Sequence, residues 1–222
     1  MAETGRRLSW VVALAIVVGL IIAYVSVLVV YAKGGTDDGA DASKPAANGV
    51  VVYLDINTVN GADFEVAGTV SVDAGGDLLD GRGDLKQDLT VDVSPMVSDT
   101  ELTFPPAGTR PGVLPVSLYS DGDIRLWPFD RYVAESVTVK AFGPNDAELA
   151  TEVVLIDSLI GWDIKAGDTV ADGKAFPVTS SRAAASLAFD LALCAMLVVL
   201  PICTLFVSIQ TVRHRKAFQP RW

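Results

Sequence analysis

The sequence has one histidine and two cysteines in 222 residues, and its 17 basic side chains are outnumbered by 27 acidic ones. So little histidine and cysteine leaves almost no material for a zinc site, a Cys/His nucleophile or a disulfide framework. The net charge of −10 argues against nucleic acid as a partner, because phosphates require a basic surface. Carboxylates are plentiful, but nothing in the sequence raises one pKa above another, as general acid–base chemistry requires. We therefore expect no enzymatic activity, no cofactor, no metal and no nucleic-acid partner.

Formal charge is absent from a first long apolar run, residues 8–31. As a helix this run measures about 36 Å, enough to cross a hydrocarbon core of about 30 Å. A cleaved signal peptide is the alternative interpretation, but its apolar region would cover only about 7–15 residues and end in a small-x-small site. This run lacks such a site and contains Trp10, Tyr24 and Tyr31. It is therefore predicted to be a retained transmembrane helix.

A second apolar run, residues 183–212, ends directly before a basic cluster that begins at Arg213. Asp190 falls near the opposite membrane face, and Pro201 falls near mid-span, where a kink is expected. Basic residues flank the outer sides of both runs, so the positive-inside rule predicts a two-pass inner-membrane protein with both termini in the cytoplasm. The predicted segments are a cytoplasmic N-terminus (1–7), a transmembrane helix (8–31), a tether (32–48), an extracytoplasmic β-domain (49–180), a second transmembrane helix (183–212) and a basic cytoplasmic tail (213–222).

The predicted exported part is acidic, and its sequence alternates in polarity. Residues 33–182 hold 25 acidic and 11 basic side chains, so we expect anionic headgroups to repel this domain rather than let it lie flat on lipid. Alternation with period two is typical of half-buried strands. The predicted strands are Val50–Ile56, Phe64–Val72, Leu89–Val93, Val113–Tyr119, Tyr132–Phe142 and Ala150–Ile156, with a weaker one at Leu102–Phe104. This series predicts an all-β, antiparallel, immunoglobulin-like sandwich flanked by two transmembrane α-helices.

The spacing of the cysteines argues against a disulfide between them, and the spacing of the acidic loops argues against a calcium site. Cys194 and Cys203 lie nine residues apart in the second run, and nine steps of about 100° place them on roughly opposite helix faces. They therefore cannot pair with each other, and we expect no disulfide partner. Acidic loops at 73–84 and 121–123 offer oxygens to calcium, but they fit neither the EF-hand spacing nor the glycine–aspartate repeat. We interpret them as solvated turns.

Residues 127–132 spell the distinctive hexapeptide Trp-Pro-Phe-Asp-Arg-Tyr. Trp127 and Pro128 are predicted to set a turn. Asp130 is predicted to accept backbone N–H groups across that turn, and Tyr132 to open the next strand. The alternative is that the aromatic side chains cradle a ligand.

Small residues recur every four positions in both apolar runs. They are Ala15, Gly19 and Ala23 in the first run, and Ala184, Ala188 and Ala192 in the second. Small residues at this spacing let helix backbones approach closely, and such packing drives association in lipid. Asp190 neighbours the second stripe and is predicted to hydrogen-bond a partner near the outer interface. These residues are the predicted partner contacts, and the alternative is that the two helices merely pack against each other.

The two apolar runs, the β-domain between them, the aromatic-Pro-Phe-Asp-x-Tyr motif at 127–132 and the basic tail form a recognisable combination. It resembles a family of two-span membrane proteins of mycobacteria and related actinobacteria that carry this motif. The resemblance implies an accessory subunit of the mycobacterial Mce lipid importer, docked beside integral-membrane permease subunits through its helices. It brings no catalytic residues. The Pro-Phe-Asp turn is also similar to one in pentameric ligand-gated channels, but those need four spans, so channel function does not follow.

Two functional hypotheses follow from the sequence. The first is a non-enzymatic accessory subunit that stabilises or regulates a lipid transporter, with transporter subunits and the lipid bilayer as its partners. The alternative is a membrane-anchored, extracytoplasmic ligand-binding or sensing module of the cell envelope, whose outer sandwich captures a lipid, a sugar or a cation. A membrane-tethered hydrolase rests on the abundance of carboxylates alone and ranks last.

Overall fold

The computed structural model describes two separate units of the chain. One unit covers residues 36–183 and contains a β-sandwich, and the other combines residues 1–35 with 184–222 and is helical where it is described. The described residues are 18–19, 21–22, 24–26, 28–29, 44–97, 102–104, 112–166 and 174–215.

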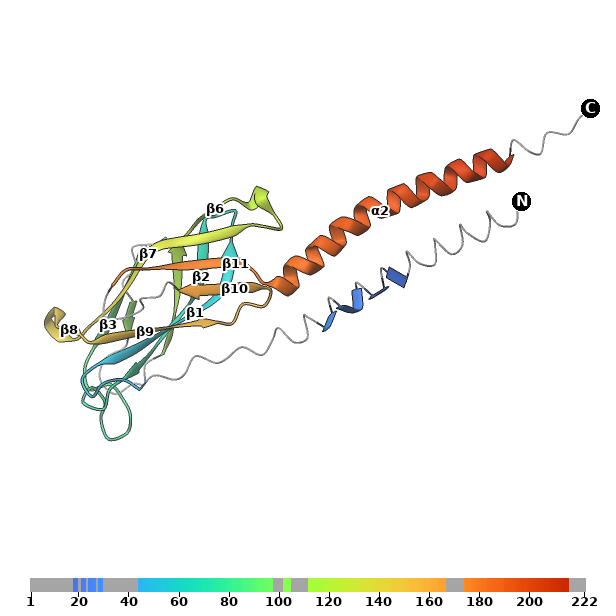
Figure 1. Cartoon of the computed structure of the whole chain (residues 1–222). Coiled ribbons are helices and arrows are strands. Elements are labelled where there is room, and N and C mark those ends of the chain that lie inside the picture. Colours follow the sequence, from blue (N-terminus) through green and yellow to red (C-terminus); the bar gives the residue numbers. More distant parts are fainter. Residues whose placement is uncertain are drawn as a thin grey trace, which may run out of the picture. The chain divides into compact units, whose positions relative to one another are not determined.

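Two β-sheets make up the sandwich (Figure 1). The first sheet has the strand order β5-β2-β1-β9 and comprises β1 (Val50–Asn60), β2 (Glu65–Ala74), β5 (Val113–Tyr119) and β9 (Thr151–Asp157). The second sheet has the order β10-β11-β7-β3-β4 and comprises β3 (Leu89–Ser94), β4 (Leu102–Phe104), β7 (Arg131–Phe142), β10 (Trp162–Ala166) and β11 (Phe176–Arg182). Two short strands, β6 (Asp121–Gly122) and β8 (Glu148–Leu149), also pair with β7, and the 3-10 helices are η1 (Ile124–Leu126) and η2 (Pro144–Asp146).

The core of the sandwich is filled by alternate residues of these strands. In β1, for example, Val52, Leu54 and Ile56 are fully buried between the sheets. Burying one such side chain contributes about 1.5–3 kcal/mol. The largest fully buried side chains are Tyr132, Phe104 and Phe176, all from the second sheet. The period-two pattern of the sequence thus records which residues face the core.

The seven predicted strands are all present, but the prediction of a wholly antiparallel sandwich is wrong. Strands β1 and β9 pair in parallel, from Val50 opposite Thr151 to Ile56 opposite Asp157. The alternation of apolar and polar residues shows which face of a strand is buried but not the direction of the neighbouring strand. The parallel pairing could therefore not be predicted from it. The two strands β10 and β11 were also missed, together with the short β6 and β8.

Strand directions give the sandwich two distinct ends. At one end lie the β1–β2 turn, the segment from β6 through η1 to β7, the β9–β10 turn and the last residue of β11, Arg182. We call this the exit end, because the chain leaves the sandwich there. The opposite end carries the acidic loops around Asp80 and η2. Ala46 and Ala47, at the close of the predicted tether, hydrogen-bond to the sandwich at that opposite end through Gly49 and Asp77.

The second predicted transmembrane segment is a long apolar helix, α2 (Ala184–Arg215). Its portion Ala184–Val212, 29 residues, is long and apolar enough to cross a membrane, as the sequence predicts. The helix continues through Pro201, whose ring nitrogen has no hydrogen to donate to the preceding turn. Just beyond it, the Thr204 hydroxyl donates to the carbonyls of Leu200 and Pro201.

The first predicted transmembrane segment is described only in part. Residues 18–19, 21–22, 24–26 and 28–29 are helical, and the Ser26 hydroxyl donates to the Ile22 carbonyl 2.8 Å away. Ala15, Ala23 and the remainder of 8–31 lie outside the described residues. Within the described part of the chain, α2 is the one helix that meets the length and composition of a membrane span.

Candidate functional site

The hexapeptide 127–132 joins η1 to β7 at the exit end. Asp123 caps η1, its carboxylate accepting the backbone N–H of Arg125 at 2.9 Å. The backbone N–H of Trp127 donates to the Ile124 carbonyl at 3.2 Å, and that of Phe129 donates to the Leu126 carbonyl at 2.8 Å. The peptide bond between Trp127 and Pro128 is cis. The structure thus places a tight turn at Trp127 and Pro128, and Tyr132 is the second residue of β7, both as predicted.

Asp130 forms a buried ion pair with Arg182. The carboxylate receives two hydrogen bonds from the guanidinium, Nε to Oδ1 at 3.0 Å and Nη2 to Oδ2 at 3.2 Å. Asp130 is only 2% exposed. The pairing arises because β7 and β11 are antiparallel neighbours with Arg131 opposite Ser181, so the residue before β7 meets the last residue of β11. Two parallel N–H···O bonds of this kind are stronger and more directional than a single charged contact.

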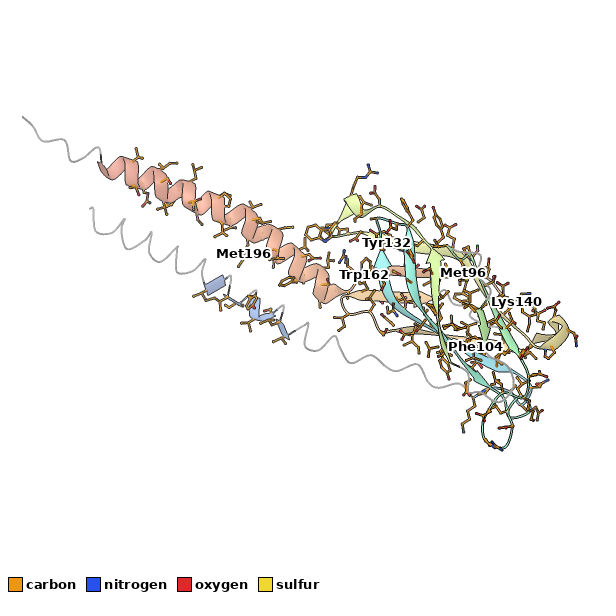
Figure 2. All side chains as sticks on the ribbon, turned by 180° about the vertical axis from the view of Figure 1, so that it is seen from behind. Met96, Phe104, Tyr132, Lys140, Trp162 and Met196 are labelled. Carbon is orange, nitrogen blue, oxygen red and sulfur yellow. The ribbon has the colours of Figure 1, made fainter. Side chains whose placement is uncertain are left out.

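The Trp162 ring lies over the guanidinium, and the Tyr132 ring packs against the Trp162 ring. The Arg182 Cζ lies 4.3 Å from the centroid of the Trp162 ring, its cross-strand partner in β10. The rings of Trp162 and Tyr132 follow at 5.8 Å between centroids, and Figure 2 shows both at the exit end. A cation over an indole face is attracted by the ring quadrupole. The order Asp130, Arg182, Trp162, Tyr132 is therefore a continuous cluster, which we call the exit-end cluster.

Tyr132 also connects the two sheets. Its side chain is 1% exposed and runs beside two glycines. A Cβ added to Gly122 in β6 would lie 2.3 Å from the Tyr132 Cδ1, and one added to Gly61 in the β1–β2 turn would lie 2.0 Å from the Tyr132 Oη. Only glycine leaves room for the phenol at these two positions. Burial, and next the negative charge of Asp130, raise the pKa of Tyr132 above 10.0.

The structure corrects the predicted role of Asp130. The sequence predicted that backbone N–H groups of the turn donate to this carboxylate. In the structure, the Arg182 side chain donates to it instead. Arg182, Trp162, Gly61 and Gly122 were missed because they are remote in sequence. One feature of the sequence could have indicated Arg182 as the partner of Asp130. A carboxylate inside an apolar turn needs a cation, and Arg182 is the last charged residue before the second apolar run.

The aromatic side chains of the hexapeptide do not converge on one point. Tyr132 is buried in the cluster, whereas Trp127 and Phe129 are exposed. Ile124 and Leu126 of η1 are exposed beside them, and so is Ile160 in the β9–β10 turn. The motif therefore has a buried half that fixes the turn and an apolar half that faces outward.

The acidic turns use their carboxylates on their own backbone. The Asp80 Oδ1 accepts the N–H of Arg82 at 2.7 Å and that of Asp84 at 3.0 Å. These bonds hold the pKa of Asp80 below 3.8. Asp123 is engaged in the same way by Arg125, first through the side chain and then through the backbone, and its pKa is likewise lowered. Across the described residues, no three His, Cys, Asp or Glu side chains gather as a metal site would require.

The predicted membrane contacts fall on α2 and on the partly described first segment. Ala184 is exposed at the start of α2, and Ala188 and Ala192 are half-buried. Asp190 is two residues from each of the latter, which is about 200° around a helix. It therefore lies opposite the alanine stripe, and the prediction that it neighbours that stripe is wrong. Its Oδ2 is buried and has no hydrogen-bond partner within the described part of the chain.

In the first segment, Gly19 is helical, and a Cβ added there would meet no described atom within 4 Å. This glycine face is open in the described part of the chain. Its predicted neighbours in the stripe, Ala15 and Ala23, lie outside the described residues.

Comparison with known proteins identifies the family of this chain. No curated protein matches the chain. A family model described as a domain of unknown function (DUF4436) matches residues 40–181, well over half of the chain. The matched region spans the β-sandwich up to the residue before Arg182. The chain therefore belongs to the DUF4436 family.

Proposed function

We propose that this protein is a non-enzymatic accessory subunit of a lipid import complex of the mycobacterial Mce type. It crosses the inner membrane twice, keeps both termini in the cytoplasm and holds its immunoglobulin-like sandwich in the periplasmic space. It stabilises or regulates the transporter by contacting permease subunits through its membrane helices. The resemblance carried by the motif at 127–132 and by the basic tail supports this proposal.

The single observation that carries the proposal is the character of α2. Over Ala184–Val212 the helix has a single formally charged side chain, Asp190, and is otherwise mostly apolar, and none of its most apolar stretch is buried by the described part of the chain. A long helix that is mostly apolar and unburied needs lipid or other helices around it. Contact with neighbouring helices inside the bilayer is thus an activity that this segment is suited to perform.

Asp190 adds a polar contact to that apolar helix. An ionisable side chain within a membrane segment faces a partner or a polar interface, because hydrocarbon solvates it poorly. The described residues supply no hydrogen bond to its Oδ2. A donor on a permease subunit would satisfy this oxygen near the outer interface.

The exit-end cluster supports a positioning role for the sandwich. The ion pair between Asp130 and Arg182 fixes the last residue of β11, and Ala183 alone separates it from the first residue of α2. A domain attached without a linker stays close to the level at which its anchor enters the membrane. Such an attachment suits a subunit that holds neighbours in place.

Affinity purification from gently solubilised native membranes, followed by mass spectrometry, tests the proposal. We expect permease subunits of a lipid importer to co-purify with the full chain. Recovery of the protein alone from several mild detergents would contradict the proposal. The same purified chain also discriminates the sensing alternative, because stabilisation against heat by calcium or by extracted envelope lipids would favour a ligand-binding module.

Substitutions in the helices test the proposed contact face. Ala188→Leu and Gly19→Leu should weaken co-purification, because a larger side chain holds a neighbouring helix away. Leu200→Phe is the matched control, since it enlarges an exposed side chain that lies about 120° around α2 from Ala188 and about 80° from Asp190. We expect the control to co-purify like the unmodified chain. Equal recovery of all three variants would remove the small-residue face from the proposal.

A further inference from the structure

Large exposed apolar side chains gather at the exit end of the sandwich. Ile124 and Leu126 of η1, Trp127 and Phe129 of the following turn, and Ile160 of the β9–β10 turn are all exposed. We call these five residues the apolar collar. At the opposite end, the described residues expose a single large apolar side chain, Val113. A soluble surface rarely concentrates apolar side chains in this way, so the collar needs an occupant.

The collar flanks the point at which the chain leaves the sandwich. On one side, the ion pair between Asp130 and Arg182 ties the collar's turn to the end of β11. On the other side, the backbone N–H of Ala183 donates to the Gly161 carbonyl at 3.0 Å, next to Ile160. Figure 1 shows β6, the loop beyond it and the end of β11 at this same end of the sandwich. The two loops are therefore fixed to Arg182 and Ala183, the two residues that precede α2.

The length of α2 sets the level of the exit end relative to a bilayer. Residues 191–212 measure about 33 Å as a helix, which matches a hydrocarbon core of about 30 Å. The first six steps, from Ala184 to Asp190, then add about 9 Å, whereas the polar headgroup layer is roughly 5–8 Å thick on each side. Ala183, through which the chain leaves the sandwich, thus lies at the outer edge of that layer. Side chains of the sandwich that lie at this level reach the interface, where aromatic residues of membrane proteins concentrate.

We infer that the apolar collar inserts its side chains into the interfacial layer of the membrane that α2 enters, so that the lipid surface is its occupant. This inference rests on the proposal that α2 is embedded in the membrane. We favour lipid over a protein partner because the collar flanks the residues through which the chain enters its proposed membrane span. The nearby charge of Arg125 is neutralised by Asp123, 3.0 Å away, which lowers the cost of bringing this loop to the surface.

Photocrosslinking of the full chain in vesicles tests this contact. The photoreactive residue p-benzoylphenylalanine replaces Phe129 in the collar, which is 64% exposed, and in separate chains replaces Val113 at the opposite end, also 64% exposed. Each chain is reconstituted in phosphatidylcholine vesicles, irradiated, and weighed by intact-protein mass spectrometry. We expect a lipid adduct at Phe129 in several-fold higher yield than at Val113. Equal yields, or no adduct at Phe129, would overturn the inference.

A third position separates the collar from the anchor. The same photoreactive residue at Phe206, an exposed residue of α2, reports whether the helix itself is in lipid. An adduct at Phe206 without one at Phe129 would overturn the collar alone. Absence of both would overturn the collar together with the membrane anchoring on which it rests. Capture of a protein instead of lipid at Phe129 in native membranes would also overturn it, in favour of a partner subunit.

The salt dependence identifies the kind of contact. Because the collar is apolar and the domain as a whole is acidic, its lipid contact should not depend on anionic headgroups. We expect the adduct yield at Phe129 in phosphatidylcholine vesicles to be the same at low and high salt, and we expect phosphatidylglycerol not to raise it. A yield that falls steeply with salt would contradict apolar insertion.

Discussion

Arg182→Ala and Asp130→Ala should destabilise the sandwich unequally, because the two partners of the ion pair differ in their access to water. The Arg182 side chain is 24% exposed, whereas that of Asp130 is 1% exposed. Removing Arg182 leaves a buried carboxylate unpaired, which costs about 3–5 kcal/mol, and also removes the cation–π contact with Trp162, worth roughly 0.5–2 kcal/mol. Removing Asp130 leaves a guanidinium that keeps the Trp162 face and reaches water, so we expect a loss of about 1–3 kcal/mol.

The measurement is equilibrium unfolding of the full chain in detergent micelles, followed by near-ultraviolet circular dichroism. Arg182→Ala should lower the free energy of unfolding by about 3 kcal/mol more than Asp130→Ala. The double replacement should cost less than the sum of the two, since neither partner is then left alone. Arg182→Lys is the matched control: it keeps the charge and loses the two-pronged hydrogen bonding, so its cost should be intermediate.

Two results would refute this reasoning. Equal costs for the two single replacements would mean that burial of the carboxylate does not control the energetics. Strictly additive costs in the double replacement would mean that the two side chains do not interact. The second outcome would also remove the ion pair as the feature that fixes the end of β11.

Three further predictions concern the same domain, each measured by thermal or denaturant unfolding. Stability should fall above pH 10, because unfolded Tyr132 then ionises while the raised pKa keeps the folded phenol protonated, with a slope up to about 1.4 kcal/mol per pH unit. Tyr132→Phe should lose this part of the decline, and Tyr119→Phe, at an exposed phenol, should keep it. Gly61→Ala should cost about 1–3 kcal/mol, and part of this cost should vanish in a Tyr132→Phe background, where the clashing hydroxyl is gone. Asp80→Ala should make the acid decline below pH 4 shallower, because the lowered pKa of Asp80 contributes stability that is lost as pH falls; an unchanged acid limb would contradict this.

The strands that sequence alone could predict are those whose alternation is clean. Strand β5 was predicted with the bounds that the structure has, because Val116 and Leu118 alternate with polar or exposed positions. Strand β11 was missed because Pro177, which cannot donate to a ladder, interrupts its pattern. In the structure Pro177 sits where the register between β11 and β7 shifts, at a bulge that tolerates it. Local pattern therefore predicts regular strands and fails where irregular geometry accommodates an unfavourable residue.

In the candidate site, too, features set by neighbouring residues were predictable and contacts between remote residues were not. The turn at Trp127 and Pro128 follows from local chemistry, so it was predictable from six consecutive residues. The partner of Asp130 was not predictable in this way, because Arg182 lies 52 residues further along the chain and meets it only through the β7–β11 pairing. Gly61 is equally remote from Tyr132, and its role becomes visible only when the phenol is in place.

The hexapeptide combines two kinds of residue whose requirements differ physically. Asp130 and Tyr132 are buried, and their partners are other residues of the sandwich, so their contribution is to its stability. Trp127 and Phe129 are exposed, and burying them would require a surface from outside the sandwich. A single turn can carry both because successive residues point to opposite sides, inward to the cluster and outward from the exit end. The buried half fixes the position of the exposed half, and chain continuity through Ala183 fixes both near the start of α2. The motif is therefore constrained on two sides at once, by the buried partners of Asp130 and Tyr132 and by the exposed apolar surface of Trp127 and Phe129.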